Sequence, residues 1–199
     1  KSTVGTLAEI HHFLRLAFVK LGTQHCPDCK VPIEPQSEEA ILARLMREFR
    51  GQRVGLLAPL VVNRKGVYTD LAKWTRSTGF PHLRVDGAFL PVDPFPRIDR
   101  FKEHNIELPV ADLRVDAAAE TALRKALAGS LEFGKGTVLV LSDLDELVKA
   151  AAKGNALNLK QHVFSTKRAC PACGRSFAEL DPRLFSYNSR HGWCASCVG

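Results

Sequence analysis

Apolar residues recur at helical spacing in two stretches near the start of the chain, separated by a loop that carries cysteines. Thr6 and Glu9 have the spacing of a capping box ahead of the first stretch, and Ser37 is expected to cap the second. Gly22 and Gly51 supply the two helix ends. The first apolar face consists of Ile10, Leu14, Ala17, Phe18 and Leu21. The second consists of Ile41, Leu42, Leu45, Met46 and Phe49.

From Gln52 onward the pattern changes to short apolar runs that are separated by turn residues. Asp86-Gly87 between two such runs predicts a β-hairpin. Pro109 cannot donate a backbone hydrogen bond, so its strand is expected to be an edge strand or to carry a bulge. The expected strands cover residues 54–62, 82–85, 88–92, 105–115, 137–141 and 157–164. The expected helices cover residues 69–78, 116–131 and 143–152.

These elements predict an α+β fold in three segments. Residues 1–51 form a helical segment with a cysteine loop, and residues 52–154 form a mixed α/β insertion. Residues 155–199 form a cysteine module that is expected to pack with residues 1–51. The two cysteine regions bracket the mixed segment, which suggests an insertion carried between two parts of one metal-bearing unit.

The composition permits several classes of function. The formal charge of +7 allows contact with nucleic acid, but it is equally explained by solubility. The longest apolar runs are far short of a membrane span, and the polar start does not resemble a signal peptide. Six cysteines without a secretory signal indicate metal binding or free thiols rather than disulfides, and a cytoplasmic location is expected.

Four cysteines near the end of the chain have the spacing of a structural zinc site. Cys170 and Cys173 form one x2 pair, and Cys194 and Cys197 form another after 20 residues. Two such pairs can place four thiolates in a tetrahedron around one Zn²⁺, with no open position for catalysis.

Cys26 and Cys29 form a third x2 pair that has no obvious partner pair. They are a candidate second zinc site whose further ligands are sought among His11, His12, His25 and His162. Two plain exposed thiols are the somewhat favoured alternative. A redox dithiol is a third, although no thioredoxin-like strand precedes the pair.

Signatures of catalysis are weak. The sequence has no Gly-x4-Gly-Lys-Ser/Thr phosphate loop, so this chain is not expected to hydrolyse ATP by itself. Asp143, Asp145 and Glu146 follow a predicted strand and resemble an acidic metal site only weakly. A solvated helix N-terminus explains them better.

Basic residues gather around the last cysteines and on turns of the insertion. The candidate DNA-binding residues are Lys167, Arg168, Arg175, Arg183 and Arg190, interleaved with Phe185, Tyr187 and Trp193. A solvated rim explains them equally well. The candidate protein-binding residues on turns are Arg64, Lys65, Arg84 and Asp86.

The stretch Arg183-Leu-Phe-Ser-Tyr-Asn-Ser-Arg-His-Gly192, with its flanking cysteine pairs, resembles the first zinc module of the UvrA family. These are the damage-recognition ATPases of bacterial nucleotide excision repair. Ser2–Thr6 and the loop from Cys26 to Ile33 also resemble the family. The turns at residues 63–66 and 84–87 resemble the segment that binds UvrB in that family.

The resemblance implies a non-enzymatic fragment of a UvrA-like protein, housekeeping or paralogous. The ATP-binding motifs would lie before Lys1 and after Gly199. The expected partners are UvrB and, for the whole parent, damaged double-stranded DNA and a second copy in a homodimer. The expected cofactor is one Zn²⁺, with a second in question. A free-standing zinc-ribbon protein that binds nucleic acid is the alternative.

Overall fold

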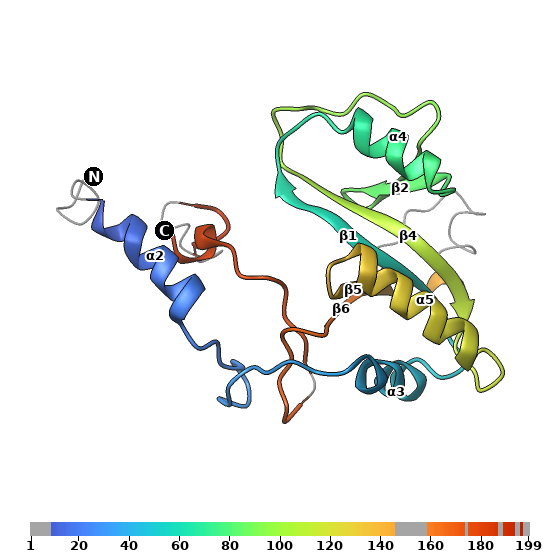
Figure 1. Cartoon of the computed structure of the whole chain (residues 1–199), viewed down its shortest axis with the longest axis horizontal. Coiled ribbons are helices and arrows are strands. Elements are labelled where there is room, and N and C mark those ends of the chain that lie inside the picture. The colour runs from blue at the N-terminus through green and yellow to red at the C-terminus, as the bar shows by residue number, and fades with distance from the viewer. Residues whose placement is uncertain (1–8, 146–158, 174, 187–188, 194–195, 197–199) are drawn as a thin grey trace.

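Two long antiparallel strands, β1 (Arg53–Arg64) and β4 (His104–Arg114), form the centre of a six-stranded sheet in this computed structural model (Figure 1). The structure describes residues 9–145, 159–173, 175–186, 189–193 and 196. The strand order is β3-β2-β4-β1-β5-β6, and each neighbouring pair is antiparallel. The other strands are β2 (His82–Val85), β3 (Ala88–Pro91), β5 (Thr137–Leu141) and β6 (Gln161–Ser165).

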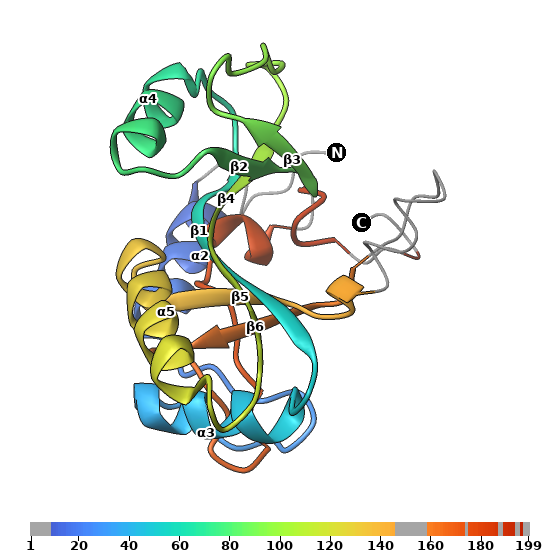
Figure 2. The ribbon, with the colours of Figure 1, turned by 90° about the vertical axis from the view of Figure 1, so that its right-hand side faces the viewer.

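Helices α3 (Glu38–Glu48), α4 (Thr69–Ser77) and α5 (Glu120–Phe133) lie on one face of this sheet (Figure 2). Ser37 caps α3 by accepting the Ala40 N–H through its side chain, as predicted. The larger core cluster joins α3 and α5 to β1, β5 and β6. Its fully buried side chains include Ile41, Leu45, Leu56, Leu123, Leu127 and Phe164.

A second cluster packs α4 against β2 and β4 near the other end of the long strands. A third, smaller cluster lies on the opposite face of the sheet, around Leu57, Leu139 and Leu141. The long strands therefore hold two cores along their length, and their far ends carry the loops of the upper part of Figure 1.

Strand β4 is an interior strand of the sheet, and Pro109 pairs with Leu57 of β1. On the other side of β4, the pairs with β2 involve only Ile106 and Glu107. The register between β1 and β4 shifts at this point, where Leu56 faces Ala111 and Leu57 faces Pro109. The bulge accommodates a residue that has no N–H to donate. Of the two expectations for this strand, the bulge is confirmed.

The hairpin predicted at Asp86-Gly87 is confirmed. Asp86 has φ of 49° and Gly87 has φ of 92°, and the flanking strands β2 and β3 pair directly. Positive φ at both turn residues is the type I′ geometry that fits the twist of the strands.

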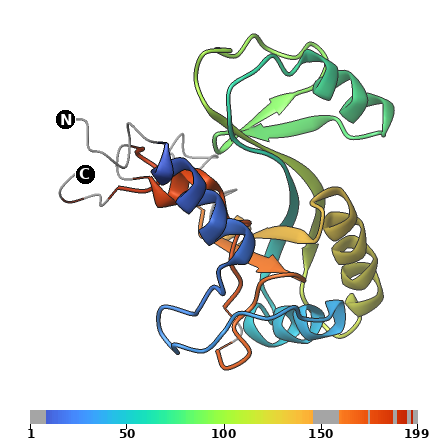
Figure 3. The same ribbon diagram turned by 60° about the vertical axis from the view of Figure 1, so that its left-hand side comes forward.

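Helix α2 (Ile10–Leu21) lies apart from the sheet and packs beside the short 3₁₀ helix η1 (Pro182–Phe185) (Figure 3). The rings of Phe18 and Phe185 stack with centroids 5.5 Å apart. None of the residues of α2 is buried. Thr6 of the expected capping box lies outside the described residues, and Glu9 occupies the N-cap position without a side-chain hydrogen bond.

The α+β class is confirmed, and each expected strand has an observed counterpart. The helix expected at 143–152 falls mostly outside the described residues, with only residues 144 and 145 seen as helical. Strand β6 belongs to the sheet, although it lies after residue 154, the expected end of the insertion. The expected segment boundaries stay a prediction. No helix in the described ranges is both long and apolar enough to cross a membrane.

We expect Phe164→Ala to lower the free energy of unfolding by about 3–5 kcal/mol, because it leaves a cavity where β6 joins the main core. Phe164 is 1% exposed and contacts the ring of Phe49 edge-on. Urea unfolding followed by far-UV circular dichroism measures the change. Phe101→Ala, at a side chain that is 69% exposed, is the matched control and should change stability by less than about 0.5 kcal/mol. Equal effects of both variants would contradict the placement of β6.

Candidate metal centre and interaction surfaces

Two loops that are far apart in sequence meet below the sheet and bring four cysteines together. Glu34 and Ala169 exchange two backbone hydrogen bonds of 2.8 Å, which join the loop after α2 to the segment after β6. Gln36 adds side-chain bonds to the carbonyl of Ser165 and to Ser176. The two segments are therefore held side by side by backbone pairing as well as by the cysteines.

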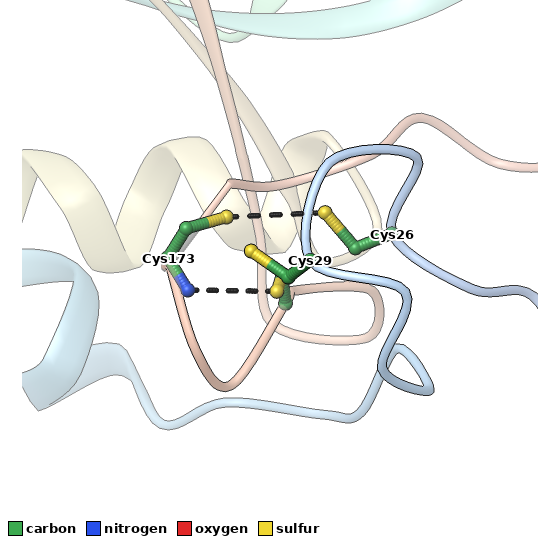
Figure 4. A group of neighbouring side chains, drawn as sticks. Cys26, Cys29 and Cys173 are labelled. Atoms are coloured by element: carbon green, nitrogen blue, oxygen red, sulfur yellow. Dashed lines mark hydrogen bonds between the residues drawn. The ribbon is translucent and has the colours of Figure 1, made fainter.

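The four sulfur atoms belong to Cys26, Cys29, Cys170 and Cys173, and all lie within 4.8 Å of one another (Figure 4). The Sγ atoms of Cys26 and Cys173 are 3.9 Å apart. A tetrahedral zinc site with Zn–S bonds of about 2.3 Å needs sulfur atoms about 3.8 Å apart. The observed spacing fits this requirement, and four thiolates leave no open position for a catalytic water.

Each cysteine pair is shaped by local backbone bonds. The Cys26 N–H donates to the Val31 carbonyl, and the Lys30 N–H donates to the Cys26 carbonyl, both at 2.9 Å. In the other pair the Cys170 N–H donates to the Arg175 carbonyl at 2.8 Å, and the Cys173 N–H points at the Cys170 sulfur. Each loop thus turns tightly enough for its two sulfurs to face one point.

The protonation of these thiols differs from site to site. The backbone N–H of Cys173 stabilises the Cys170 thiolate and lowers its pKa to about 7. A hydrogen bond with the Cys173 side chain raises the pKa of Cys29 to about 12. Four sulfurs this close cannot all ionise without a cation among them, because like charges repel at this distance. A divalent cation among the sulfurs would offset this repulsion and favour the deprotonated form of the coordinating thiols.

The grouping of Cys26 and Cys29 with Cys170 and Cys173 was not among the expectations from sequence. The sequence suggests histidines as further ligands of the first pair, but the cluster found among the described residues holds no histidine, and His162 packs edge-on against Phe49. Cys194 and Cys197 lie outside the described residues, so their pairing with Cys170 and Cys173 stays a prediction. Spacing reveals each pair, but it does not show which pairs meet.

The basic residues near the cysteines mostly have partners within the chain. Arg175 pairs with Asp28 at 2.7 Å, and Arg168 donates to Gln24. Arg183 and Arg190 both pair with Glu103. Lys167 is exposed. Whether these residues contact DNA stays a prediction.

The four candidate protein-binding residues lie at the far end of the sheet, but in different environments. Arg64 and Lys65 are exposed at the end of β1. Arg84 is only 9% exposed and points to Glu107 and Gln161. Burial raises the pKa of Glu107, and the Arg84 charge offsets part of that effect. Arg84 is therefore held inside the fold.

Asp86 organises the loops at this end. Its carboxylate accepts the Asn105 N–H at 2.8 Å and contacts Nδ1 of His104 at 2.6 Å, while Nε2 of His104 contacts the Asp99 carbonyl. The Asn105 side chain in turn accepts the Asn63 N–H, which fixes the turn before Arg64. These bonds tie the turn at 63–66, the hairpin and the loop before β4 into one unit.

The acidic residues considered as a catalytic cluster have basic partners in the fold. Asp145 pairs with Arg114 at 2.8 Å, and Asp143 with Lys160 at 3.4 Å. Glu146 lies outside the described residues. Paired surface carboxylates of this kind do not indicate a catalytic site.

Serine substitutions test the cysteine grouping. We expect the double variant Cys26→Ser, Cys29→Ser to lose about one bound metal ion per chain relative to the wild type, because it removes two of four thiolate ligands. Elemental analysis of the purified chain measures the content. The matched variant Cys194→Ser, Cys197→Ser should keep this ion. Loss in the second variant but not the first would show that Cys170 and Cys173 pair with the last cysteines instead.

The buried His104 should make stability depend on pH. The hydrogen bond that the His104 ring donates to the Asp86 carboxylate raises the pKa of His104 above its ordinary value of 6.5. The stabilisation is therefore fully present below that ordinary value, and it is lost as the pH rises through the raised pKa of the folded state. Asp86→Asn should cost more stability at pH 5.5 than at pH 8.5 in urea unfolding. An equal cost at both values, or the same pattern in the exposed control Asp70→Asn, would contradict this role.

The chain matches one family model and several curated proteins. A family model described as the UvrA interaction domain matches residues 36–143. The chain is 34% identical over 200 residues to UvrABC system protein A of Pseudomonas aeruginosa. It is 36% identical over 201 residues to that of Treponema pallidum and 36% over 199 residues to that of Escherichia coli K12. Each match covers 100% of this chain but only 20–21% of the relative.

The chain thus spans about a fifth of the length of these curated relatives. The matched range begins just before α3 and ends after β5, so it contains five of the six strands. Because a family model covers more than half of its residues, the chain belongs to the UvrA interaction domain family.

Proposed function

We propose that this chain is a non-enzymatic interaction module of a UvrA-like nucleotide excision repair protein, and that it docks UvrB. The match of residues 36–143 to the UvrA interaction domain carries the proposal. The parent protein would bind and hydrolyse ATP, form a homodimer in the cytoplasm and load UvrB at damaged DNA. This chain contributes the docking and does not hydrolyse ATP by itself.

The docking surface lies at the end of the sheet where β1 ends at Arg64 and β4 begins at His104. Arg64 lies opposite His104 in the β1–β4 register, so the turn at 63–66 and the loop before β4 lie side by side. Exposed apolar side chains flank the basic turn: Val62 at 53%, Val67 at 66% and Phe101 at 69%. Apolar anchors beside charges are typical of specific protein interfaces.

Arg64 and Lys65 supply the charge for this surface, while Arg84 supports it from inside the fold and Asp86 from the exposed hairpin turn. Exposed arginine and lysine steer an acidic partner and fix its orientation. Arg84 and Asp86 hold β2, β4 and the turn at 63–66 in place through their hydrogen bonds. Replacing either would disturb the surface as a whole and would not report on a single contact.

We propose Zn²⁺ as the ion at Cys26, Cys29, Cys170 and Cys173. An all-sulfur tetrahedral site is typical of structural zinc. The ion would clamp the two ends of the inserted sheet together and so fix its angle to the rest of the parent. The basic residues Lys167, Arg168, Arg175 and Arg190 would then face DNA in the parent, whereas Arg183 is held by Glu103, Asp181 and the Asn63 carbonyl.

A free-standing zinc protein that binds nucleic acid is the second candidate, favoured by the formal charge of +7. It requires salt-dependent binding of DNA with no partner present, with a slope set by the number of phosphates that are neutralised. The interaction-domain match favours the first candidate.

Calorimetric titration of the zinc-loaded chain with purified UvrB at two salt concentrations tests the proposal. We expect saturable binding near one to one, and Lys65→Glu should weaken it roughly tenfold, less at high salt, because a like charge then faces the acidic partner. Lys125→Glu, at an exposed position of α5, makes the same change in charge away from the surface and should leave affinity unchanged. Absence of binding by the folded, zinc-loaded chain would refute the docking function.

A further inference from the structure

Glu103 lies just before β4 and gathers three basic side chains from the C-terminal segment. Its Oε1 atom accepts a hydrogen bond from Arg183 at 2.9 Å. Its Oε2 atom accepts one from Arg190 at 3.1 Å and lies 2.8 Å from Nε2 of His191. The Glu103 side chain is only 17% exposed, and the hydrogen bonds from His191 and Arg190 hold its pKa below the ordinary range, so it is a carboxylate at neutral pH.

Arg183 is a structural anchor in this cluster. Besides Glu103 it binds the carboxylate of Asp181 and the backbone carbonyl of Asn63, at 2.8 and 3.0 Å. A guanidinium with this many partners has few N–H groups left for another ligand. It joins η1 to the turn at 63–66.

Arg190 is held differently. Its side chain is 65% exposed, and its one ion pair among the described residues is the 3.1 Å contact with Glu103. Because the Arg190 guanidinium is largely exposed and makes a single hydrogen bond to Glu103, this ion pair is weak, and another anion can take the place of the carboxylate at Arg190.

We propose that Arg190 is a gated contact for a phosphate of a nucleic-acid backbone, and that Glu103 is the gate. The proposal rests on the DNA contact that forms part of the proposed function. A guanidinium binds carboxylate and phosphate through the same fork of N–H donors, so the two anions compete for one site. Glu103 occupies that site in the free chain, and the dense charge of a duplex supplies the competitor.

Two substitutions open the gate in different ways. Glu103→Gln removes the competing charge. Glu103→Asp keeps the net charge but is one methylene shorter, so it can no longer reach both Arg183 and Arg190. With either variant we expect a fluorescein-labelled 30-base-pair duplex to bind roughly threefold tighter in anisotropy titrations, and no more than about fivefold, since the displaced ion pair is weak. The slope of log affinity against log salt should steepen by about 0.9, which corresponds to one further phosphate.

The controls distinguish the release of Arg190 from a general effect of net charge on duplex binding. Adding Arg190→Ala to each variant should abolish the gain, and Arg190→Ala alone should change affinity by less than about twofold, because the wild-type side chain is masked. Asp70→Asn changes the net charge as Glu103→Gln does, at an exposed pair with Lys73 on α4. If Glu103→Gln fails to fold, the charge-conserving variant Glu103→Asp tests the proposal instead.

Several outcomes would overturn the gate. It fails if both variants bind like the wild type or like Asp70→Asn, or if the gain survives Arg190→Ala. If Lys167→Ala weakens duplex binding while the Glu103 variants do nothing, the DNA contact stands and the gate alone is wrong. If no variant binds the duplex while UvrB still binds, the DNA contact is wrong and the gate falls with it.

Discussion

The joining of two distant loops at the cysteine cluster is the constraint on which the rest of the structure depends. The loop at 26–34 and the segment at 169–176 pair through backbone bonds and place four sulfurs at one point. Everything from α3 to β6 lies between these loops in sequence, so closing them brings the two ends of the sheet domain together. A domain closed at its base in this way is carried as one unit by the chain on either side.

A second tie joins the same C-terminal segment to the opposite end of the sheet. Arg183 contacts Glu103, just before β4, and the carbonyl of Asn63, near the end of β1. The segment therefore runs beside the sheet, from the cysteines at its base to the loops at its tip. Strands β1 and β4 are long and pack into two cores, so they form a stiff element. This element fixes the position of the Arg183 contacts relative to the cysteine cluster.

Local chemistry was readable from the sequence wherever one residue decides the backbone. Asp86-Gly87 predicted its hairpin and Ser37 its cap, and Pro109 predicted either an edge strand or the bulge that is observed, since each acts through its own φ or hydrogen bond. The meeting of Cys26 with Cys173 was not readable, because pair spacing says nothing of which loops the fold brings together. The burial of Arg84 was also missed. Leu83 and Val85 flank Arg84 in a strand, so alternation places its side chain on the opposite face, which a single sequence gives as solvent-facing, whereas both faces of β2 are buried here.

The ion pairs also change what the positive charge of the chain means. A formal charge of +7 suggests a surface ready for phosphate, yet Arg175, Arg183 and Arg190 each have a carboxylate partner in the fold. Charge that is neutralised within the chain becomes available only when its partner is displaced. Glu103 belongs to the loop that borders the proposed docking surface, so a protein that moves this loop would release Arg190 at the same time. Protein docking and phosphate contact would then be linked through one carboxylate, with reciprocal effects on the two affinities.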